Sequence, residues 1–278
     1  MLLSAGGAAA DVAWGADRLA WTGAVTQVEG AGGGGLVPWA LIAGLGTADQ
    51  IGGSAFFTYA HTADFSTRAG GIAVGLYDRV ELSFARQRFD AFSVIPGLTL
   101  GQDVFGLKCR ILGDAVFEPD RWLPQIAVGL LLKRTLDFDF VPHAVGAEKG
   151  HDLDVYVAAT KVYFAALAGR NVIVDATLRR SRANQFGLLG FGGDRRSGYR
   201  YLPEASVGIL LSEKILVGGE WRSKPDNLGV FSEGSAKDAF VAWNPDKAFT
   251  ATFAWVDLGL IAGKSAQRGL YASIWYGF

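Results

Sequence analysis

Apolar and polar residues alternate along most of this 278-residue chain. In the segment 79–89, Val80, Leu82 and Phe84 fall on one side of an extended chain, whereas Glu81 and Ser83 fall on the other. Because successive side chains of a β-strand point to opposite faces, this period of two predicts strands with one apolar face. The pattern predicts an all-β fold with twelve strands, over residues 51–60, 67–77, 79–90, 100–113, 124–135, 152–167, 171–183, 201–211, 215–223, 236–244, 248–259 and 267–278. Two weaker candidates cover residues 19–28 and 38–46.

The apolar face of such strands can line a soluble core or contact lipid, and the composition favours lipid. Half of the residues are hydrophobic and 19% are charged, whereas soluble proteins average about 25% charged residues. A membrane-spanning helix needs roughly 18 or more apolar residues in a row. The longest charge-free window, 30–48, contains seven glycines and Pro38, which makes it a poor helix. A chain this apolar can still enter a bilayer as a closed β-barrel, in which every backbone polar group pairs between strands.

Aromatic residues and loop lengths indicate a barrel of the bacterial outer membrane. Aromatic side chains gather towards the predicted strand ends, as in interfacial girdles: Trp122, Tyr201, Trp221, Trp243, Trp255, Tyr276 and Phe278. Short connections such as 77–79 alternate with long ones such as 136–150 and 184–199, which is typical of short periplasmic turns and longer extracellular loops. We therefore expect a closed antiparallel transmembrane barrel in the Gram-negative outer membrane. Its lipid-facing residues should include Val80, Leu82, Phe84, Leu130, Leu132, Phe253 and Trp255.

The two weaker candidates bring the expected number of strands to fourteen, and even strand numbers are the rule in bacterial single-chain barrels. Twelve strands with an N-terminal plug are the alternative. The apolar stretch Leu2–Ala10 is similar to the tail of a signal peptide, with an A-x-A-like end at 8–10, although a basic region is missing. Residues 1–18 are therefore interpreted as a signal-peptide remnant or a flexible N-terminus, and residues 19–278 as the barrel.

The last strand carries a candidate assembly signal. An apolar face ends in a terminal aromatic residue, formed by Leu270, Ala272, Ile274, Tyr276 and Phe278. This pattern resembles the signal that the barrel-assembly machinery of Gram-negative bacteria reads, which makes that machinery an expected partner. An exposed strand edge with an apolar face is the kind of segment that binds by adding a strand to a sheet.

Two segments carry a resemblance to a known family. Residues 25–47, VTQVEGAGGGGLVPWALIAGLGT, and residues 71–90, GIAVGLYDRVELSFARQRFD, resemble a family of exported Gram-negative proteins that is described only as a domain of unknown function. The resemblance implies an outer-membrane barrel. It supplies no activity, cofactor or catalytic residue.

Several function classes find no support in the composition. The net charge of −1 gives no support for a nucleic-acid partner, which would require a basic patch. The single cysteine, Cys109, excludes an internal disulfide and a cysteine zinc cluster. The glycine run 32–35 lacks the Gly-Lys-Ser/Thr that a phosphate-binding loop requires. No cofactor is expected.

The three histidines, His61, His143 and His151, fall in or next to the predicted extracellular loops. A rim hydrolase or acyltransferase would need a nucleophile and an orienting group near one of them. No spacing selects such groups, and the nearest candidates are Ser93, Asp139 and Asp152. A metal site on His143, His151 and the nearby aspartates 137 and 139 also lacks a recognised ligand spacing. We expect no catalytic and no metal-binding residues.

Charged residues on the inward face are the candidate pore lining. The basic members are Arg79, Lys108, Arg110, Lys133, Lys161, Arg179 and Arg222, and the acidic members are Glu81, Asp175, Glu204, Glu220 and Asp238. A barrel of this size is too wide to be filled by its own side chains, so the lumen should hold water, a plug or both. Charged linings set selectivity in such pores.

These residues predict a passive, porin-like channel for small hydrophilic solutes, with a weak preference for anions. A gate would come from residues 29–37 or from loop 136–150. A non-conducting scaffold barrel for an envelope complex, which leaves a protein partner possible, is the alternative, and mutually paired lumen charges would favour it. A barrel enzyme acting on lipid or peptide is the third possibility.

Four arginines fall on the outward face near the extracellular ends of their strands: Arg86, Arg88, Arg180 and Arg182. The planar guanidinium group suits the phosphates of lipopolysaccharide. Simple snorkelling of long side chains to the membrane boundary would place them equally well. Outer-membrane lipid and lipopolysaccharide are therefore expected partners.

Overall fold

The computed structural model describes residues 13–18, 21, 23, 25–118 and 122–278. The candidate signal-peptide tail, Leu2–Ala10, lies outside the described residues, as does part of the candidate strand 19–28. No helix in the described part of the chain is long and apolar enough to cross a membrane.

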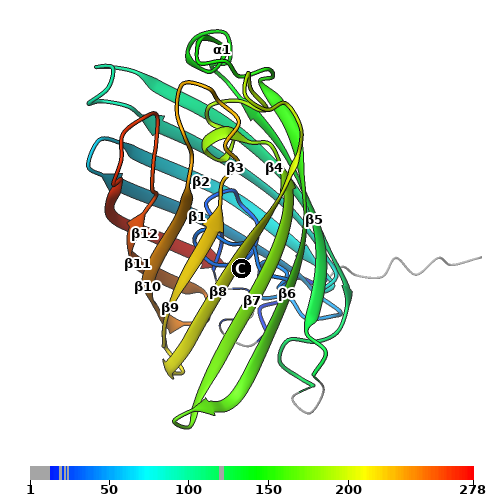
Figure 1. Ribbon diagram of the computed structural model, residues 1–278. Helices are drawn as coiled ribbons and strands as arrows, with labels where there is room; N and C mark the ends of the chain where they lie inside the picture. Colours follow the sequence, from blue (N-terminus) through cyan, green and yellow to red (C-terminus); the bar gives the residue numbers. More distant parts are fainter. Residues whose placement is uncertain (1–12, 19–20, 22, 24, 119–121) are drawn as a thin grey trace, which may run out of the picture.

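The described residues form twelve strands that close into an antiparallel barrel (Figure 1). Each strand pairs with its neighbours in sequence, and the first pairs with the last. The strands are β1 (Ile51–Thr62), β2 (Ser66–Leu76), β3 (Val80–Asp90), β4 (Thr99–Leu112), β5 (Gln125–Thr135), β6 (His151–Leu167), β7 (Arg170–Ser181), β8 (Arg200–Ser212), β9 (Ile215–Ser223), β10 (Ser235–Asp246), β11 (Phe249–Asp257) and β12 (Arg268–Gly277). They are the twelve that the alternation predicts, with ends no more than two residues from the predicted limits.

The expectation of fourteen strands is wrong. Residues 38–46, the fuller of the two weak candidates, form no strand, and neither do the described residues of 19–28. Residues 25–46, which we call the plug segment, lie inside the barrel instead, visible as the blue trace within the ring of strands in Figure 1. Val37, Ala40 and Leu45 of this segment are completely buried. The alternative of twelve strands with an N-terminal plug therefore describes the fold.

The two faces of the wall differ as the alternation predicts. The seven residues expected to face lipid all lie on the outward face, where Leu82 is 50% exposed and Phe253 is 64% exposed. The next residues along these strands, such as Glu81 and Ala254, are buried on the inward face. Apolar exposure of this extent around a closed wall is typical of a lipid-facing surface.

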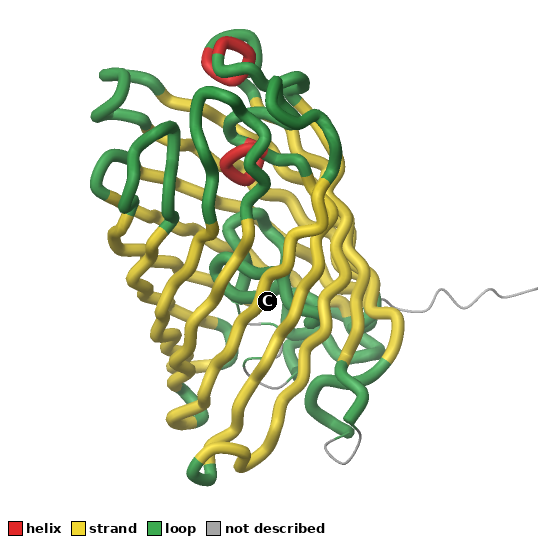
Figure 2. Tube along the Cα trace, in the orientation of Figure 1, coloured by secondary structure: helices red, strands yellow, loops and turns green. Residues whose placement is uncertain are grey.

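The two ends of the barrel differ in their connections. One end, here called the loop end, carries the long connections 91–98, 136–150, 182–199, 224–234 and 258–267. The short helices α1 (Val141–Ala144) and η1 (Asn184–Gly187) belong to two of these loops. Figure 2 shows α1 above the loop end and η1 within the outline of the barrel. The opposite end, the turn end, has tight connections such as 77–79 and 213–214 and one long connection, 113–124, and it also holds Phe278.

The C-terminal strand seals the barrel against β1. The Phe278 backbone N–H donates to the Gly53 carbonyl at 2.9 Å, and the Gly53 N–H donates to the Phe278 carbonyl at 2.6 Å. The Phe278 ring stacks on Trp14 with 6.5 Å between ring centroids. The predicted signal residues share the outward face, with Leu270, Ile274, Tyr276 and Phe278 exposed. Their role in assembly stays a prediction.

Candidate functional site

The lumen of the barrel brings together charged side chains from the wall and the plug segment. Eight of the predicted pore-lining residues are buried on the inward face, at alternate positions of their strands: Glu81, Lys108, Lys133, Asp175, Arg179, Glu204, Glu220 and Arg222. Asp238 is partly buried beside them and faces Gly34 and Gly35 of the plug segment. The inward surface is therefore a contact surface for the plug segment.

Three predicted pore-lining residues lie elsewhere. Arg79 is exposed in the β2–β3 turn, before β3 begins. Lys161 was expected in the lumen, but the inward positions of β6 are the even-numbered ones, such as Asp154, Tyr156 and Thr160. The Lys161 ammonium instead donates to the carbonyl oxygens of Asp114 and Glu118 in the β4–β5 connection. Arg110 lies at the turn end, where it forms ion pairs with Asp78 and Asp114.

A buried ion pair between Glu81 and Lys108 holds the backbone of the plug segment. The two side chains are 2.9 Å apart. The Glu81 carboxylate accepts the N–H groups of Gly32 at 3.0 Å and Ala43 at 2.7 Å. The Lys108 ammonium donates to the carbonyls of Gly32 at 2.8 Å and Leu41 at 2.7 Å. Both charges are thus paired and hydrogen-bonded, which is the condition for burying them.

Glu220 binds the plug segment from the opposite wall. Its carboxylate accepts the Leu36 N–H at 2.7 Å. A Cβ atom on Gly34 would lie 1.8 Å from a Glu220 carboxylate oxygen. The glycine run, which lacks the marks of a phosphate-binding loop, therefore lets the plug backbone approach the wall closely.

Glu29 is the centre of a second buried set of charges. Its Oε1 lies 2.5 Å from the Lys133 Nζ and 3.0 Å from the Arg222 Nη2. Its Oε2 lies 3.4 Å from the Arg179 Nη1. Sequence reasoning missed Glu29 because it lies in the glycine-rich segment and outside the strands, where alternation assigns no face.

Two wall carboxylates complete this set. Asp154 lies 2.7 Å from Lys133, and Glu204 lies 2.5 Å from Arg179. All six side chains are at most 3% exposed. We call the set the Glu29 cluster; it consists of Glu29, Lys133, Asp154, Arg179, Glu204 and Arg222, three cations and three carboxylates. Asp154 was also missed, although its even position in β6 next to inward-facing Tyr156 is a signal that could have found it.

A loop from the loop end reaches the same cluster. The Phe186 carbonyl of η1 accepts hydrogen bonds from Lys133 at 3.2 Å and from Gln102 at 3.3 Å. The Arg222 guanidinium lies 4.2 Å from the centroid of the Phe186 ring, a cation–π contact. Gln185 and Phe186 both have positive φ angles, 45° and 63°. The lumen is therefore occupied at this level from both sides, by the plug segment and by η1.

The predicted rim arginines all lie towards the loop end. Arg86 is exposed on the outward face and binds Asp103 through two hydrogen bonds of 2.6 and 2.7 Å. Arg88 is exposed on the same face, and Arg180 is partly exposed. Arg182 lies just past β7, and the guanidinium groups of Arg180 and Arg182 both cover the Tyr199 ring. Contact with lipopolysaccharide stays a prediction.

The three histidines have separate surroundings. His61 stacks between the rings of Tyr59 and Phe92. His143 of α1 meets the edge of the Phe138 ring, and His151 begins β6. The Ser93 hydroxyl, a candidate nucleophile, donates to Asp64. Within the described residues, no three His, Cys, Asp or Glu side chains are grouped so that they could hold a metal ion.

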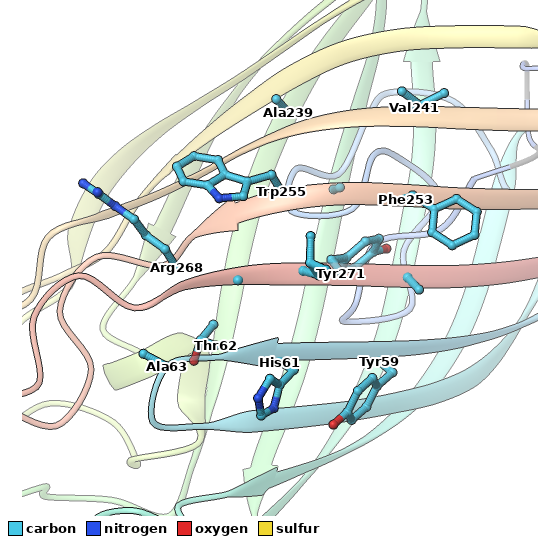
Figure 3. Close-up of a pocket in the computed structure, with 14 residues that line it drawn as sticks. Tyr59, His61, Thr62, Ala63, Ala239, Val241, Phe253, Trp255, Arg268 and Tyr271 are labelled. Atoms are coloured by element: carbon cyan, nitrogen blue, oxygen red, sulfur yellow. The ribbon is translucent and has the colours of Figure 1, made fainter.

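A wide groove crosses β1, β10, β11 and β12 (Figure 3). The side chains that frame it include Tyr59, Phe253 and Trp255, each exposed on the outward face of the wall. The groove therefore belongs to the apolar exterior, and the charged residues that meet in the lumen take no part in it.

A family model described as a protein of unknown function, DUF3034, matches residues 22–275. The chain belongs to this family. The resemblance found in segments 25–47 and 71–90 is thereby confirmed. No curated protein matches the chain.

Solved structures that are similar to this chain include two porins and one outer membrane protein. The NanC porin has a TM-score of 0.50 and 10% sequence identity, over 81% of this chain and 98% of that chain. The KdgM porin has a TM-score of 0.49 and 9% identity, over 81% and 99%. Omp33 of Acinetobacter baumannii has a TM-score of 0.45 and 7% identity, over 82% and 98%. The similarity to the NanC porin shows that this DUF3034 chain shares its barrel fold.

Proposed function

We propose that this DUF3034 protein is an outer-membrane channel that its own plug segment closes. The observation that carries the proposal is how the plug segment is attached. Among the described residues, the backbone hydrogen bonds of residues 25–46 stay within the N-terminal region and do not reach the strands. The attachment to the wall runs through side chains, including Glu29, Glu81, Lys108 and Glu220.

The wall is complete without the plug segment, because β1 pairs directly with β12. Displacement of residues 25–46 would break ion pairs, side-chain hydrogen bonds and the apolar packing of residues such as Leu36, Trp39 and Leu41 against the wall, but no strand pairing. A twelve-stranded barrel is wider than one that its own side chains can fill. Removal of the plug segment would therefore leave a water-filled passage for small hydrophilic solutes, although η1 would still narrow it.

A weak preference for anions rests on the Glu29 cluster alone. Once Glu29 leaves, the wall at this level keeps three cations, Lys133, Arg179 and Arg222, and two carboxylates, Asp154 and Glu204. The inward wall as a whole has an acidic excess of six carboxyl groups over four basic groups, because Arg79, Arg110 and Lys161 lie elsewhere and Asp154 faces in. We therefore place the selectivity at the Glu29 cluster, where charges in a narrow passage act on a passing ion with little screening.

A non-conducting scaffold barrel is the second candidate, and one observation favours it. The buried charges of the lumen are mutually paired, as in the Glu29 cluster and the Glu81–Lys108 pair. A barrel that serves only as a support for envelope partners would need no path for solutes.

Conductance in planar bilayers separates the two candidates. The protein with residues 25–46 intact should show rare or brief openings, deletion of residues 25–46 should give stable open channels, and Glu29→Gln should raise the open probability. Glu213→Gln is the matched control, because it removes the same charge from an exposed side chain in the β8–β9 turn. A plug-deleted barrel that is folded and inserted, yet never conducts, would contradict the channel and support the scaffold.

A further inference from the structure

An apolar chamber lies at the loop end of the lumen, beyond the Glu29 cluster. Its volume is about 170 Å³. It is lined by Phe65 after β1, Phe89 of β3, Leu100 of β4, Leu188 and Leu189 after η1, and Ile261 of the β11–β12 loop. These six side chains are at most 8% exposed. The chamber is built by six separate segments of the chain, because the β5–β6 and β9–β10 loops also line it, through Val141 and Phe231.

At the level of the chamber, the inward face of the wall changes from polar to apolar side chains. On β3 and β4, Gln87 and Gln102 face the lumen, and the next inward residues towards the loop end are Phe89 and Leu100. A passage that admits only hydrophilic solutes would not require an apolar lining at its mouth. A void among apolar side chains also lowers stability, because the lining atoms lose contacts on one side.

The chamber offers too few polar partners to hold a water molecule. Within the described residues, its single polar lining side chain is Gln185. The Gln185 amide nitrogen donates to the Leu260 carbonyl at 3.0 Å, and its amide oxygen accepts from Lys224 at 3.1 Å. A buried water needs two to four polar partners, and apolar cavities of about this size stay dry.

We infer that the chamber is a binding site for small apolar molecules of the size of a monocyclic aromatic hydrocarbon. The size follows from the volume, because an apolar cavity of about 150 Å³ accommodates benzene. Aromatic rings suit the lining, since Phe65 and Phe89 stack with 5.0 Å between centroids and present ring surface to an occupant. The inference goes beyond the proposed channel and does not depend on movement of the plug segment.

Access to the chamber leads through the β3–β4 loop. Val94 and Ile95 of this loop line the chamber and are also 39% and 44% exposed. Val94 and Ile95 thus form a single layer of chain between the chamber and the exterior of the loop end. Their side chains are apolar where they line the chamber and where they are exposed. An apolar molecule arriving from outside meets a matching surface before it enters.

Binding of toluene to the full-length protein in lipid nanodiscs tests the inference, with empty nanodiscs as the background for partition into lipid. We expect one saturable site per barrel for toluene and none for benzoate, whose charge would be buried without a partner. Ala91→Phe, which fills the chamber, should weaken toluene binding at least tenfold. Ala239→Phe, the same change on the exposed outward face, should leave it unchanged.

A second variant covers the case in which Ala91→Phe does not fold. Leu189→Ala enlarges the chamber and should raise the affinity for naphthalene at least tenfold relative to toluene. Absence of a saturable toluene site in the wild-type protein, equal binding to a folded Ala91→Phe variant, or an unchanged ligand preference in Leu189→Ala would each overturn the inference. Binding without conductance would refute only the proposed channel, and conductance without binding would refute only the chamber.

Discussion

The Glu29 carboxylate of the plug segment and the Lys133 ammonium of β5 form an ion pair of 2.5 Å with no measurable exposure of either side chain. The sequence separation between them is 104 residues, so the pair forms only when the N-terminal segment lies inside the closed barrel. Lys133 also donates to the Phe186 carbonyl of η1 at 3.2 Å. One lysine of the wall thus binds both segments that occupy the lumen.

Replacement of Glu29 by Gln should destabilise the protein strongly. The substitution leaves three buried cations, Lys133, Arg179 and Arg222, with only two carboxylates, Asp154 and Glu204. Breaking a buried ion pair from one side costs roughly 3–5 kcal/mol. Equilibrium unfolding in urea, followed in lipid vesicles, measures the change. Glu213→Gln should change the free energy of unfolding by less than about 0.5 kcal/mol, because exposed surface substitutions usually do.

Reversing the charge of a lumen residue should change the ion selectivity of the open barrel much more than reversing a charge outside the lumen. In the barrel lacking residues 25–46, Lys133→Glu should shift the reversal potential in asymmetric salt towards cations. The shift should shrink at high salt, because the Debye length falls from about 10 Å at 0.1 M to about 3 Å at 1 M. Arg88→Glu and Lys161→Glu should do far less, since Arg88 faces outward and Lys161 binds the β4–β5 connection. Equal shifts in all three variants would contradict the inward and outward assignment.

Deletion of Phe278 should impair insertion into the outer membrane. The deletion removes the backbone pairing with Gly53 and the stacking on Trp14, both at the junction of β1 and β12. The amount of heat-modifiable barrel in the outer-membrane fraction measures the effect, and we expect a several-fold loss. Phe117→Ser, at an exposed aromatic residue of the β4–β5 connection, is the control. Normal amounts of barrel without Phe278 would show that the terminal aromatic residue is dispensable.

Attachment of the β9–β10 loop should weaken as the pH rises. Burial raises the pKa of Glu233 to about 7 from an ordinary value of 4.5, although Lys224 opposes the shift. A carboxyl group whose pKa is raised by folding stabilises the native state fully below pH 4.5, and this contribution is lost as the pH rises through about 7. Lys224 and Asp226 are the charged neighbours.

Hydrogen exchange of the amides of residues 224–234 measures this effect, and protection should fall between pH 5 and pH 8 after correction for the intrinsic exchange rate. Glu233→Gln should remove most of the dependence, because its amide does not titrate. Exchange that is equally pH-dependent in both proteins would assign the effect to another group.

The wall of the barrel follows from local pattern. Period-two alternation places each side chain on one of two faces, and this holds for any extended segment whatever its neighbours are. The strands, their order and the outward position of Leu82 or Phe253 could therefore be predicted from residues alone. The lumen charges of β3, β4 and β7 could be predicted in the same way. On β6 the prediction was wrong, because Lys161 lies an odd number of residues from the inward-facing Asp154 and Tyr156 and therefore on the other face of the strand.

The sequence by itself determined an all-β barrel wall, because alternation is a property of each strand. Only the tertiary structure decided that residues 25–46 fill the lumen, that Glu29 meets three cations and that six segments enclose an apolar chamber. A glycine-rich segment has no period of its own, so nothing local in it specifies a partner. Its position depends on contacts such as Glu29–Lys133 and Leu36–Glu220, between residues more than a hundred positions apart. Such contacts exist only in the closed barrel, where the inward charges of the wall surround one space.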